Sequence, residues 1–166
     1  MNAKRMRGVY VVEFAIVGLL LFTLLFGVLE IGRLLFTVNA LNETVRRGAR
    51  LAAVCDIHEP RILRRAIFNA AEDAGASSLI GALTTAQLTL VYLDGNGNPI
   101  ASPGSSGAAG FGAIRYVQLR VENFTFTPLI PGLNGVITLP PFLSTLPRES
   151  LGRHAEPDVV PEITPC

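Results

Sequence analysis

The stretch that decides the fold is GVYVVEF at residues 8–14, in which a single carboxylate, Glu13, interrupts an apolar run. The basic leader MNAKRMR precedes it at residues 1–7, and apolar sequence continues to Leu29. About 20 apolar residues cross a bilayer as a helix, and residues 9–29 have this length. A carboxylate in hydrocarbon costs about 2.5–3.5 kcal/mol on insertion scales, so we expect Glu13 to have a function. The sequence therefore predicts a membrane helix with a functional acid near its start.

The flanks of the apolar run predict its orientation. Lys4, Arg5 and Arg7 precede the run with no acidic residue among them, which favours a cytoplasmic N-terminus. A secretory signal peptide also begins with basic residues, but its apolar region is usually shorter and ends in a small-residue cleavage site, which this run lacks. An ordinary membrane anchor with one tolerated acid is the other alternative. We expect the span to stay attached and the rest of the chain to lie outside the cytoplasm.

The helical pattern continues beyond the membrane. Apolar residues recur at spacings of three and four from Leu35 to Ala52, and the first proline is Pro60. We expect one helix of about 45 residues, roughly 65 Å long at 1.5 Å per residue, whose outer half needs partners. Glu30 is spaced to pair with Arg33 along this helix, and Glu43 with Arg46 or Arg47. The predicted organisation is a leader at 1–8, a membrane part at 9–33, a helical continuation at 34–58, a body at 59–156 and a proline-rich tail at 157–166.

Three pieces of this helix resemble one protein family. RG at residues 7–8 is followed by VEFA at 12–15, FGVLEIGR at 26–33 and RRGARLAA at 46–53. In this order they resemble the TadE-like proteins of tight-adherence (Flp-type) pilus systems, over about the first third of the chain. The resemblance implies a bacterial pseudopilin, a minor pilin-like subunit needed for assembly of a type IVc pilus. Such a subunit is not an enzyme, and it acts by helix–helix packing in the membrane and the fibre.

The same resemblance implies sites, partners and a location. A prepilin peptidase should cut between Gly8 and Val9, with Glu13 five residues after the glycine. The remaining partners implied are other pilin-like subunits, the inner-membrane pilus assembly platform and membrane lipid. The location implied is the bacterial inner membrane, single-pass, with a periplasmic C-terminal body; incorporation into an extracellular pilus is left open. The residues that match the family motifs are Phe14, Glu30, Gly32, Arg33, Arg47, Gly48, Ala49 and Arg50.

The rest of the chain predicts a small α+β body of pilin-like type, with one helix and a short antiparallel sheet. Proline near its first turn and Gly75 at its end bound the predicted helix at residues 60–74. Alternation and β-forming residues predict the strands. Glycine, serine and alanine dominate residues 101–112, which we expect to be flexible. The predicted strands are 86–93, 114–121 with a continuation at 124–126, and a short one at 136–139; the tail from 157 should be extended.

The two cysteines are Cys55 and Cys166, and both fall on the predicted periplasmic side, where disulfides persist. Cys55 follows the long helix, and Cys166 ends a tail with little else to hold it. We expect the two to form a disulfide. Two free thiols, or a bond between subunits, are the alternatives.

Catalytic patterns are scarce in this chain. A net charge of +1 excludes a strong nucleic-acid footprint. Asp56, His58 and Glu59 have no second ligand cluster, so a solvated loop is the preferred interpretation over a metal site. Residues 94–98 begin like a calcium loop but lack its glycine and closing glutamate, which favours a hairpin turn. We therefore expect no enzymatic activity, no metal and no cofactor. A membrane-anchored periplasmic binding domain unrelated to pili is the alternative function, and a membrane-tethered hydrolase a weaker one.

Overall fold

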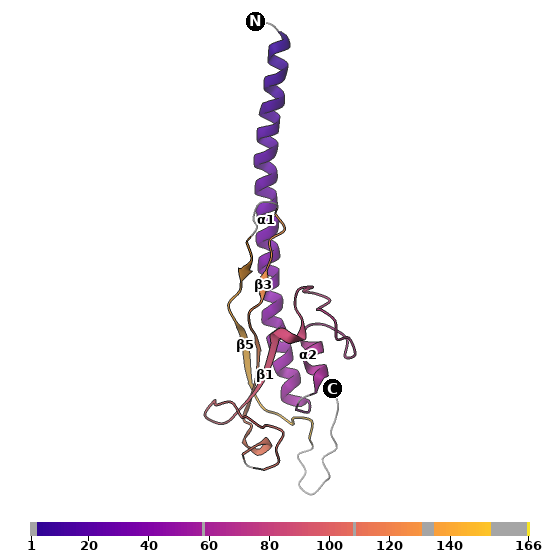
Figure 1. Cartoon of the computed structure of the whole chain (residues 1–166), viewed down its shortest axis with the longest axis vertical. Coiled ribbons are helices and arrows are strands. Elements are labelled where there is room, and N and C mark those ends of the chain that lie inside the picture. Colours follow the sequence, from indigo (N-terminus) through magenta and orange to yellow (C-terminus); the bar gives the residue numbers. More distant parts are fainter. Residues whose placement is uncertain (1–2, 58, 108, 131–134, 154–165) are drawn as a thin grey trace.

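The computed structural model describes residues 3–57, 59–107, 109–130, 135–153 and 166. It consists of one very long helix with a small body packed around its second half (Figure 1). This helix, α1, runs without interruption from Ala3 to Val54, a length of 52 residues, or about 78 Å. A short helix and antiparallel strands make up the body. The predicted α+β class, with a long N-terminal helix, is confirmed.

The two halves of α1 differ because only the second half has a stripe of small and apolar residues that the body can cover. From Val9 to Phe36 its large apolar side chains are mostly exposed to solvent, whereas burial begins at Thr37. The buried positions recur at helical spacing and form the centre of the core. They are Ala40, Leu41, Thr44, Val45, Ala49, Ala52 and Ala53, all at most 7% exposed.

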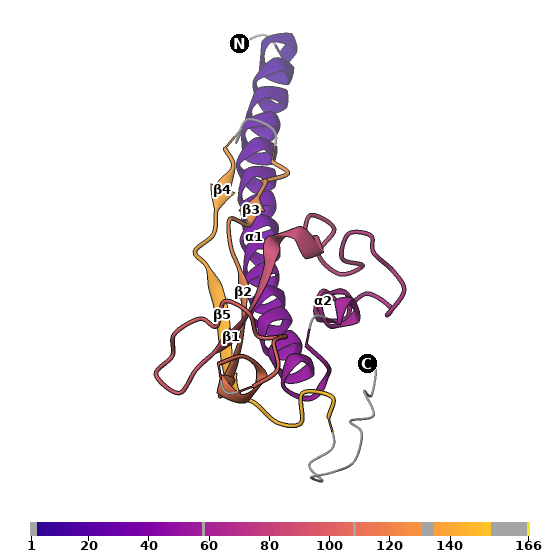
Figure 2. The same cartoon turned by 60° about the horizontal axis from the view of Figure 1, so that its bottom comes forward.

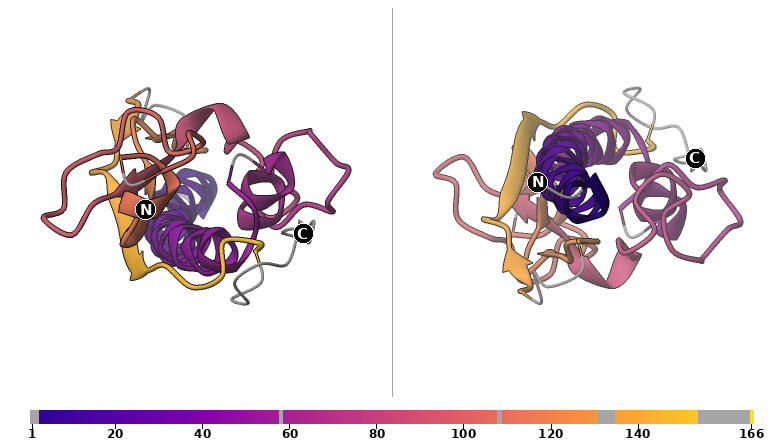
Figure 3. Two further views of the ribbon diagram at one scale, coloured as in Figure 1. Left: turned by 90° about the horizontal axis from the view of Figure 1, so that it is seen from below. Right: turned by 90° about the horizontal axis from the view of Figure 1, so that it is seen from above.

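A three-stranded antiparallel sheet covers this stripe. Its order is β1 (Leu88–Leu93), β2 (Tyr116–Val121), β5 (Phe142–Pro147), with β2 in the centre. The end-on views show the sheet and the short helix α2 on different sides of α1 (Figure 3). β1 and β2 correspond to the two predicted strands, but β5 is missing from the sequence prediction. Pro140 and Pro141 precede it and Pro147 is its last residue, and an edge strand tolerates proline because its outer N–H groups have no partner strand to bond.

Two shorter strands extend the body along α1. β3 (Thr125–Phe126) pairs antiparallel with β4 (Ile137–Thr138), and the pair lies beside α1 nearer to its N-terminal half than the main sheet does (Figure 2). The sequence predicted both segments as strands. They form a separate two-stranded sheet rather than a continuation of β2 and a third strand beside it.

The helix α2 spans Pro60–Ala66, which corrects the predicted range of 60–74. It ends because Phe68 adopts a positive φ of 67°, and the Phe68 and Asn69 amides bond back to the carbonyls of Arg65 and Arg64, a Schellman-type cap. The buried Asn69 side chain then donates to the carbonyls of Gly75 and Ala76 and accepts from the Ser78 amide. Such side-chain bonds organise a loop where apolar spacing alone suggested further helix.

The long loops contain two 3-10 turns, η1 (Thr85–Gln87) and η2 (Phe111–Ala113). Within residues 101–112, the Phe111 amide bonds the Ser105 carbonyl, and the Arg148 and Arg153 guanidinium groups lie over the Phe111 ring at 5.9 and 3.7 Å. The flexibility of this loop stays a prediction. The predicted extended tail lies outside the described residues, except for Cys166.

Candidate functional site on the long helix

The first half of α1 presents an apolar surface that no other described part of the chain covers. It is long and apolar enough to cross a membrane, and none of its apolar window is buried. Phe14 is 80% exposed and Val9 65%. Glu13 is exposed on this surface, and no ion pair to it exists within the described residues. The Thr23 hydroxyl in this stretch donates to the Leu19 carbonyl. A surface of this kind suits lipid or the helices of other subunits.

The glycines of the long helix fall into two structural classes. A Cβ placed on Gly8 or Gly32 would meet no atom within 4 Å. A Cβ placed on Gly48 would lie 2.1 Å from Leu119 Cδ2 and 2.8 Å from Ala66 Cβ. Gly48 is therefore small because α2 and β2 approach α1 at that point. Gly8 and Gly32 have no such reason within the chain, so any need for a small residue there must come from another molecule.

Glu30 and Arg33 form the first charged pair after the apolar stretch, as their spacing predicted. The Arg33 guanidinium lies 2.5 Å from Glu30 Oε1. It also donates to the Thr127 carbonyl, and its central carbon lies 4.2 Å from the centre of the Phe126 ring. Glu30 Oε2 accepts from the Leu129 amide at 3.3 Å. The pair thus attaches the segment after β3 to the helix, although the partners are 94 and 99 residues away in sequence.

The last motif residues lie where α1 enters the core. Ala49 is fully buried, which explains its small side chain. The Arg47 guanidinium lies 5.4 Å from the centre of the Phe68 ring. The predicted ion pair of Glu43 with Arg46 or Arg47 is absent from the described residues, since Glu43 has no ion pair there. Arg50 is exposed. This motif therefore packs and positions the body instead of forming a site with convergent polar groups.

The C-terminal end of α1 is held by the chain that follows β5. The helix ends at Val54, before the predicted limit of residue 58, because its last carbonyls find partners there. The Glu149 and Leu151 amides bond the Ala53 carbonyl, and the Gly152 amide and Ser150 hydroxyl bond the Val54 carbonyl. Gly152 has a φ of 73°, and a Cβ there would lie 2.6 Å from the Asp56 amide nitrogen. These interactions satisfy carbonyls that a helix end leaves unpaired.

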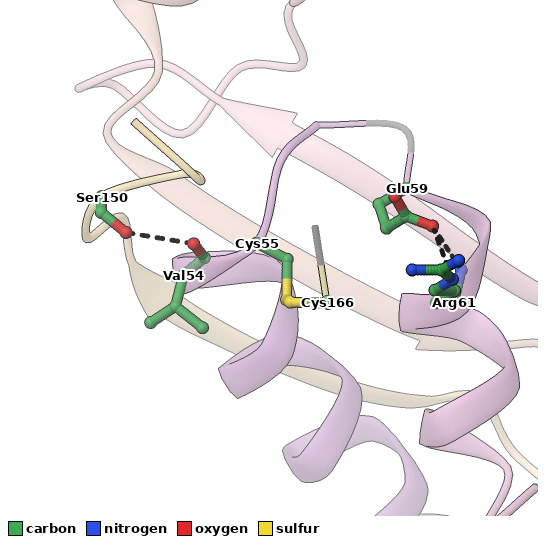
Figure 4. Close-up of a disulfide and its surroundings, with 6 residues drawn as sticks. All are labelled: Val54, Cys55, Glu59, Arg61, Ser150 and Cys166. Atoms are coloured by element: carbon green, nitrogen blue, oxygen red, sulfur yellow. Dashed lines mark hydrogen bonds and ion pairs between the residues drawn. A yellow bond between two sulfur atoms is a disulfide. The ribbon is translucent and has the colours of Figure 1, made fainter. Parts of the chain in front are cut away.

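A disulfide completes this end of the molecule. Cys55 and Cys166 are bonded, with Cα atoms 5.7 Å apart across 111 residues of sequence, as Figure 4 shows. Cys55 is fully buried. The bond and the Ser150–Val54 hydrogen bond lie side by side, so the C-terminus and the segment after β5 are both attached to the end of α1 (Figure 4). The predicted pairing is confirmed.

No group of three or more His, Cys, Asp or Glu side chains that could hold a metal ion occurs among the described residues. Glu59 accepts from the Arg61 amide and caps α2 (Figure 4); His58 lies outside the described residues. Asp94 Oδ1 accepts from the Asn96 and Asn98 amides, both at 2.8 Å, in a hairpin turn. The hydrogen bond from the Asn98 amide is the main cause of a lowered pKa of Asp94. Desolvation opposes it, and hydrogen bonds from the Asn96 amide, the Asn98 side chain and the Gly97 amide lower the pKa further. The Asp94 carboxylate therefore stabilises the turn by accepting these hydrogen bonds, as the hairpin interpretation predicted.

Sequence reasoning missed three positioning residues: Asn69, Gly152 and Thr127. Asn69 lies in an apolar helical pattern, and its deviation from that pattern was the available signal. Gly152 follows the last strand closely, where a positive φ is common. No local signal marks Thr127, because its carbonyl is used by a residue far away in sequence.

Comparisons with known proteins agree with this geometry. The family model of TadE-like protein matches residues 8–50. The matched segment lies within α1 and contains the exposed apolar half, the Glu30–Arg33 pair and Gly48. No curated protein and no solved structure matches the chain. The resemblance read from the sequence is confirmed over residues 8–50, and it suggests involvement in the assembly of Tad pili.

Proposed function

We propose that this chain is a pseudopilin, a minor pilin-like subunit needed for assembly of a tight-adherence type IVc pilus. The observation that carries the proposal is the division of α1: its outer half forms the core of the body, while its apolar half has no cover among the described residues. The family match spans both halves. The exposed half is then the surface that packs against membrane lipid, other pilin-like subunits and the inner-membrane assembly platform.

The proposed location is the bacterial inner membrane, crossed once. Lys4, Arg5 and Arg7 keep the N-terminus in the cytoplasm, and the body lies in the periplasm or, after assembly, in the extracellular fibre. The Cys55–Cys166 disulfide supports this placement because such bonds persist in the oxidising periplasm.

Processing by a prepilin peptidase between Gly8 and Val9 is part of the proposal. The open surroundings of Gly8 support it, because folding does not require a small residue there. In the native host, Gly8→Leu should leave a longer form that keeps residues 1–8. Gly18→Leu is the matched control, since Gly18 is equally open, and it should be processed normally. Mass spectrometry of the mature protein decides the matter: a wild-type chain that retains its leader would favour the membrane-anchored binding domain instead.

Glu13 should act in assembly rather than in processing. After cleavage, the Val9 ammonium would lie about 6 Å along the helix axis from Glu13, and in a bundle the carboxylate can pair with the ammonium of a neighbouring subunit, which offsets the cost of burying both charges. Glu13→Ala should be cleaved and inserted but poorly incorporated. Glu43→Ala, at an exposed position of the outer half, serves as the control. Normal pilus numbers with Glu13→Ala, counted by electron microscopy, would remove this role.

A further inference from the structure

The end of the body that faces the apolar half of α1 is unusually rich in exposed apolar side chains. Outside α1, the large apolar residues that are exposed number six within the described residues: Leu79, Tyr116, Leu129, Val136, Ile137 and Leu143. Four of them belong to this end. Leu129, Val136 and Ile137 flank or form the β3–β4 pair, and Leu79 lines a groove with Phe36 and Leu129. We call Leu79, Leu129, Val136 and Ile137 the collar.

The collar lies beside the helix where the apolar stretch ends. The Leu129 amide is bonded to Glu30, and the Thr127 carbonyl to Arg33, so the hydrogen bonds fix the level of this segment along α1. Exposed helix residues continue the apolar surface at the same level, with Ile31 at 60%, Leu35 at 57% and Phe36 at 51%. Leu129 is 74% exposed, and Val136 62%. Phe36, Leu79 and Leu129 line one groove, which Arg33 and Thr37 also line, so apolar side chains of the collar and of α1 lie next to each other there.

The collar residues lie in uncharged segments of the body. Leu79 belongs to residues 74–93, which carry no charged side chain, and residues 95–114 are uncharged as well. Residues 123–147, from the end of β2 to the end of β5, contain no Asp, Glu, Lys, Arg or His. The surfaces of soluble domains normally carry both signs of charge. An uncharged segment that exposes leucine, valine and isoleucine next to a membrane helix is what partial immersion in lipid would require.

We propose that the collar is a membrane-binding surface, inserted into the interfacial layer of the phospholipid bilayer around α1. The inference rests on the proposed function in one respect, that α1 crosses the membrane. If residues 9–29 fill the hydrocarbon, which is about 30 Å thick, residues 30–34 lie in the headgroup layer of about 5–8 Å that borders it, because at 1.5 Å per residue they rise about 7 Å. The collar is held at that depth. Strand backbone that lacks partners is tolerated there, because water reaches the interface but not the hydrocarbon centre.

Insertion of the collar fixes the orientation of the body relative to the membrane. The body would rest on the periplasmic leaflet and could not swing freely about the helix, so its orientation would be set before any contact with another subunit. Removal from the bilayer during fibre assembly would then expose the collar to neighbouring subunits. Its occupant while the chain is in the membrane is phospholipid.

The chain contains no tryptophan, so single tryptophans report on chosen positions. The full-length protein is reconstituted in phosphatidylethanolamine–phosphatidylglycerol vesicles with or without bromine on the acyl chains, which quenches nearby tryptophan. Leu129→Trp and Ile137→Trp test the collar, and either is sufficient if the other fails to fold. Phe22→Trp lies within the proposed span. Tyr116→Trp is the exposed control at the opposite end of β2.

We expect the collar tryptophans to emit at shorter wavelength than Tyr116→Trp and to lose fluorescence in brominated vesicles, with Phe22→Trp quenched most strongly. If Phe22→Trp is quenched but both collar tryptophans are quenched no more than Tyr116→Trp, the proposal that the collar binds the membrane is refuted, while the membrane span stands. The collar tryptophans could also emit at short wavelength without being quenched, and their emission could return to longer wavelength when the protein is diluted in lipid. That result would show that the collar contacts other protein molecules, and it would also overturn the proposal. An unquenched Phe22→Trp would refute the membrane span itself, and the proposed function with it.

Discussion

The packing at Gly48 leads to a quantitative prediction for the substitution Gly48→Ala. The added methyl would lie 2.1 Å from Leu119 Cδ2 and 2.8 Å from Ala66 Cβ. Both neighbours are fully buried, so neither side chain can turn into solvent, and the Ala66 methyl moves only with the α2 backbone. Overpacking costs about 1–3 kcal/mol, and an approach as close as 2.1 Å to a buried side chain puts this site in the upper part of that range, at about 2–3 kcal/mol. The better helix propensity of alanine returns about 0.8–1.0 kcal/mol. We expect a net loss of roughly 1–2 kcal/mol in the free energy of unfolding of the body.

The assay is urea unfolding of the full-length chain in detergent micelles with the disulfide intact. Near-ultraviolet circular dichroism follows the body through Tyr92, which is 3% exposed. Gly32→Ala is the matched control, because its methyl meets no atom within 4 Å, and it should leave the stability of the body unchanged or slightly higher. Combining Gly48→Ala with Leu119→Ala should cost less than the sum of the two single changes. A Gly48→Ala protein as stable as the parent would refute the steric explanation.

Three further predictions concern the attachments of the body. Cys166→Ser should lower the stability of the body by up to about 5 kcal/mol in the chain-entropy model, because the bond closes a loop of more than 100 residues. Protease resistance measures the loss, and resistance equal to that of the parent would show that the bond contributes nothing. Arg33→Met should weaken the attachment of the segment after β3 to α1 by about 1–2 kcal/mol. Faster hydrogen exchange of the Leu129 amide measures this loss, and unchanged exchange would show that the Glu30–Arg33 pair does not hold the segment. The lowered pKa of Asp94 means that its ionised form stabilises the turn; this contribution is complete above the ordinary carboxyl pKa and is lost as the pH falls through the folded-state pKa. Protection factors of the Asn98 amide should therefore fall in acid but stay constant from about pH 5 to 8, and Asp94→Asn should abolish that acid dependence.

Much of this molecule could be predicted locally. The apolar stretch, the basic leader and the spacing from Leu35 to Ala52 predict a single long helix, because each depends on residues close together in sequence. Alternation predicts β1 and β2 for the same reason. The prediction of α2 was wrong beyond Ala66, since the bonds made by Asn69 outweigh a favourable apolar spacing. β5 was not predicted because the prolines before it and at its end are compatible with a strand only at the edge of a sheet. Which strand lies at an edge is decided by the fold.

The candidate site divides in the same way. The sequence by itself determined where the long apolar helix lies, which residue is the one acid in its apolar run at residues 9–29, and which pieces resemble the TadE-like family. Tertiary structure alone decided what the motif residues do. Gly48 leaves room for the side chains of Leu119 and Ala66 to pack against α1, and Arg33 donates a hydrogen bond to the Thr127 carbonyl. The physical reason is the range of the interactions. Hydrophobic period and charge act along the helix, whereas close packing and capping bonds join segments about 20 to 100 residues apart, whose meeting depends on the whole fold.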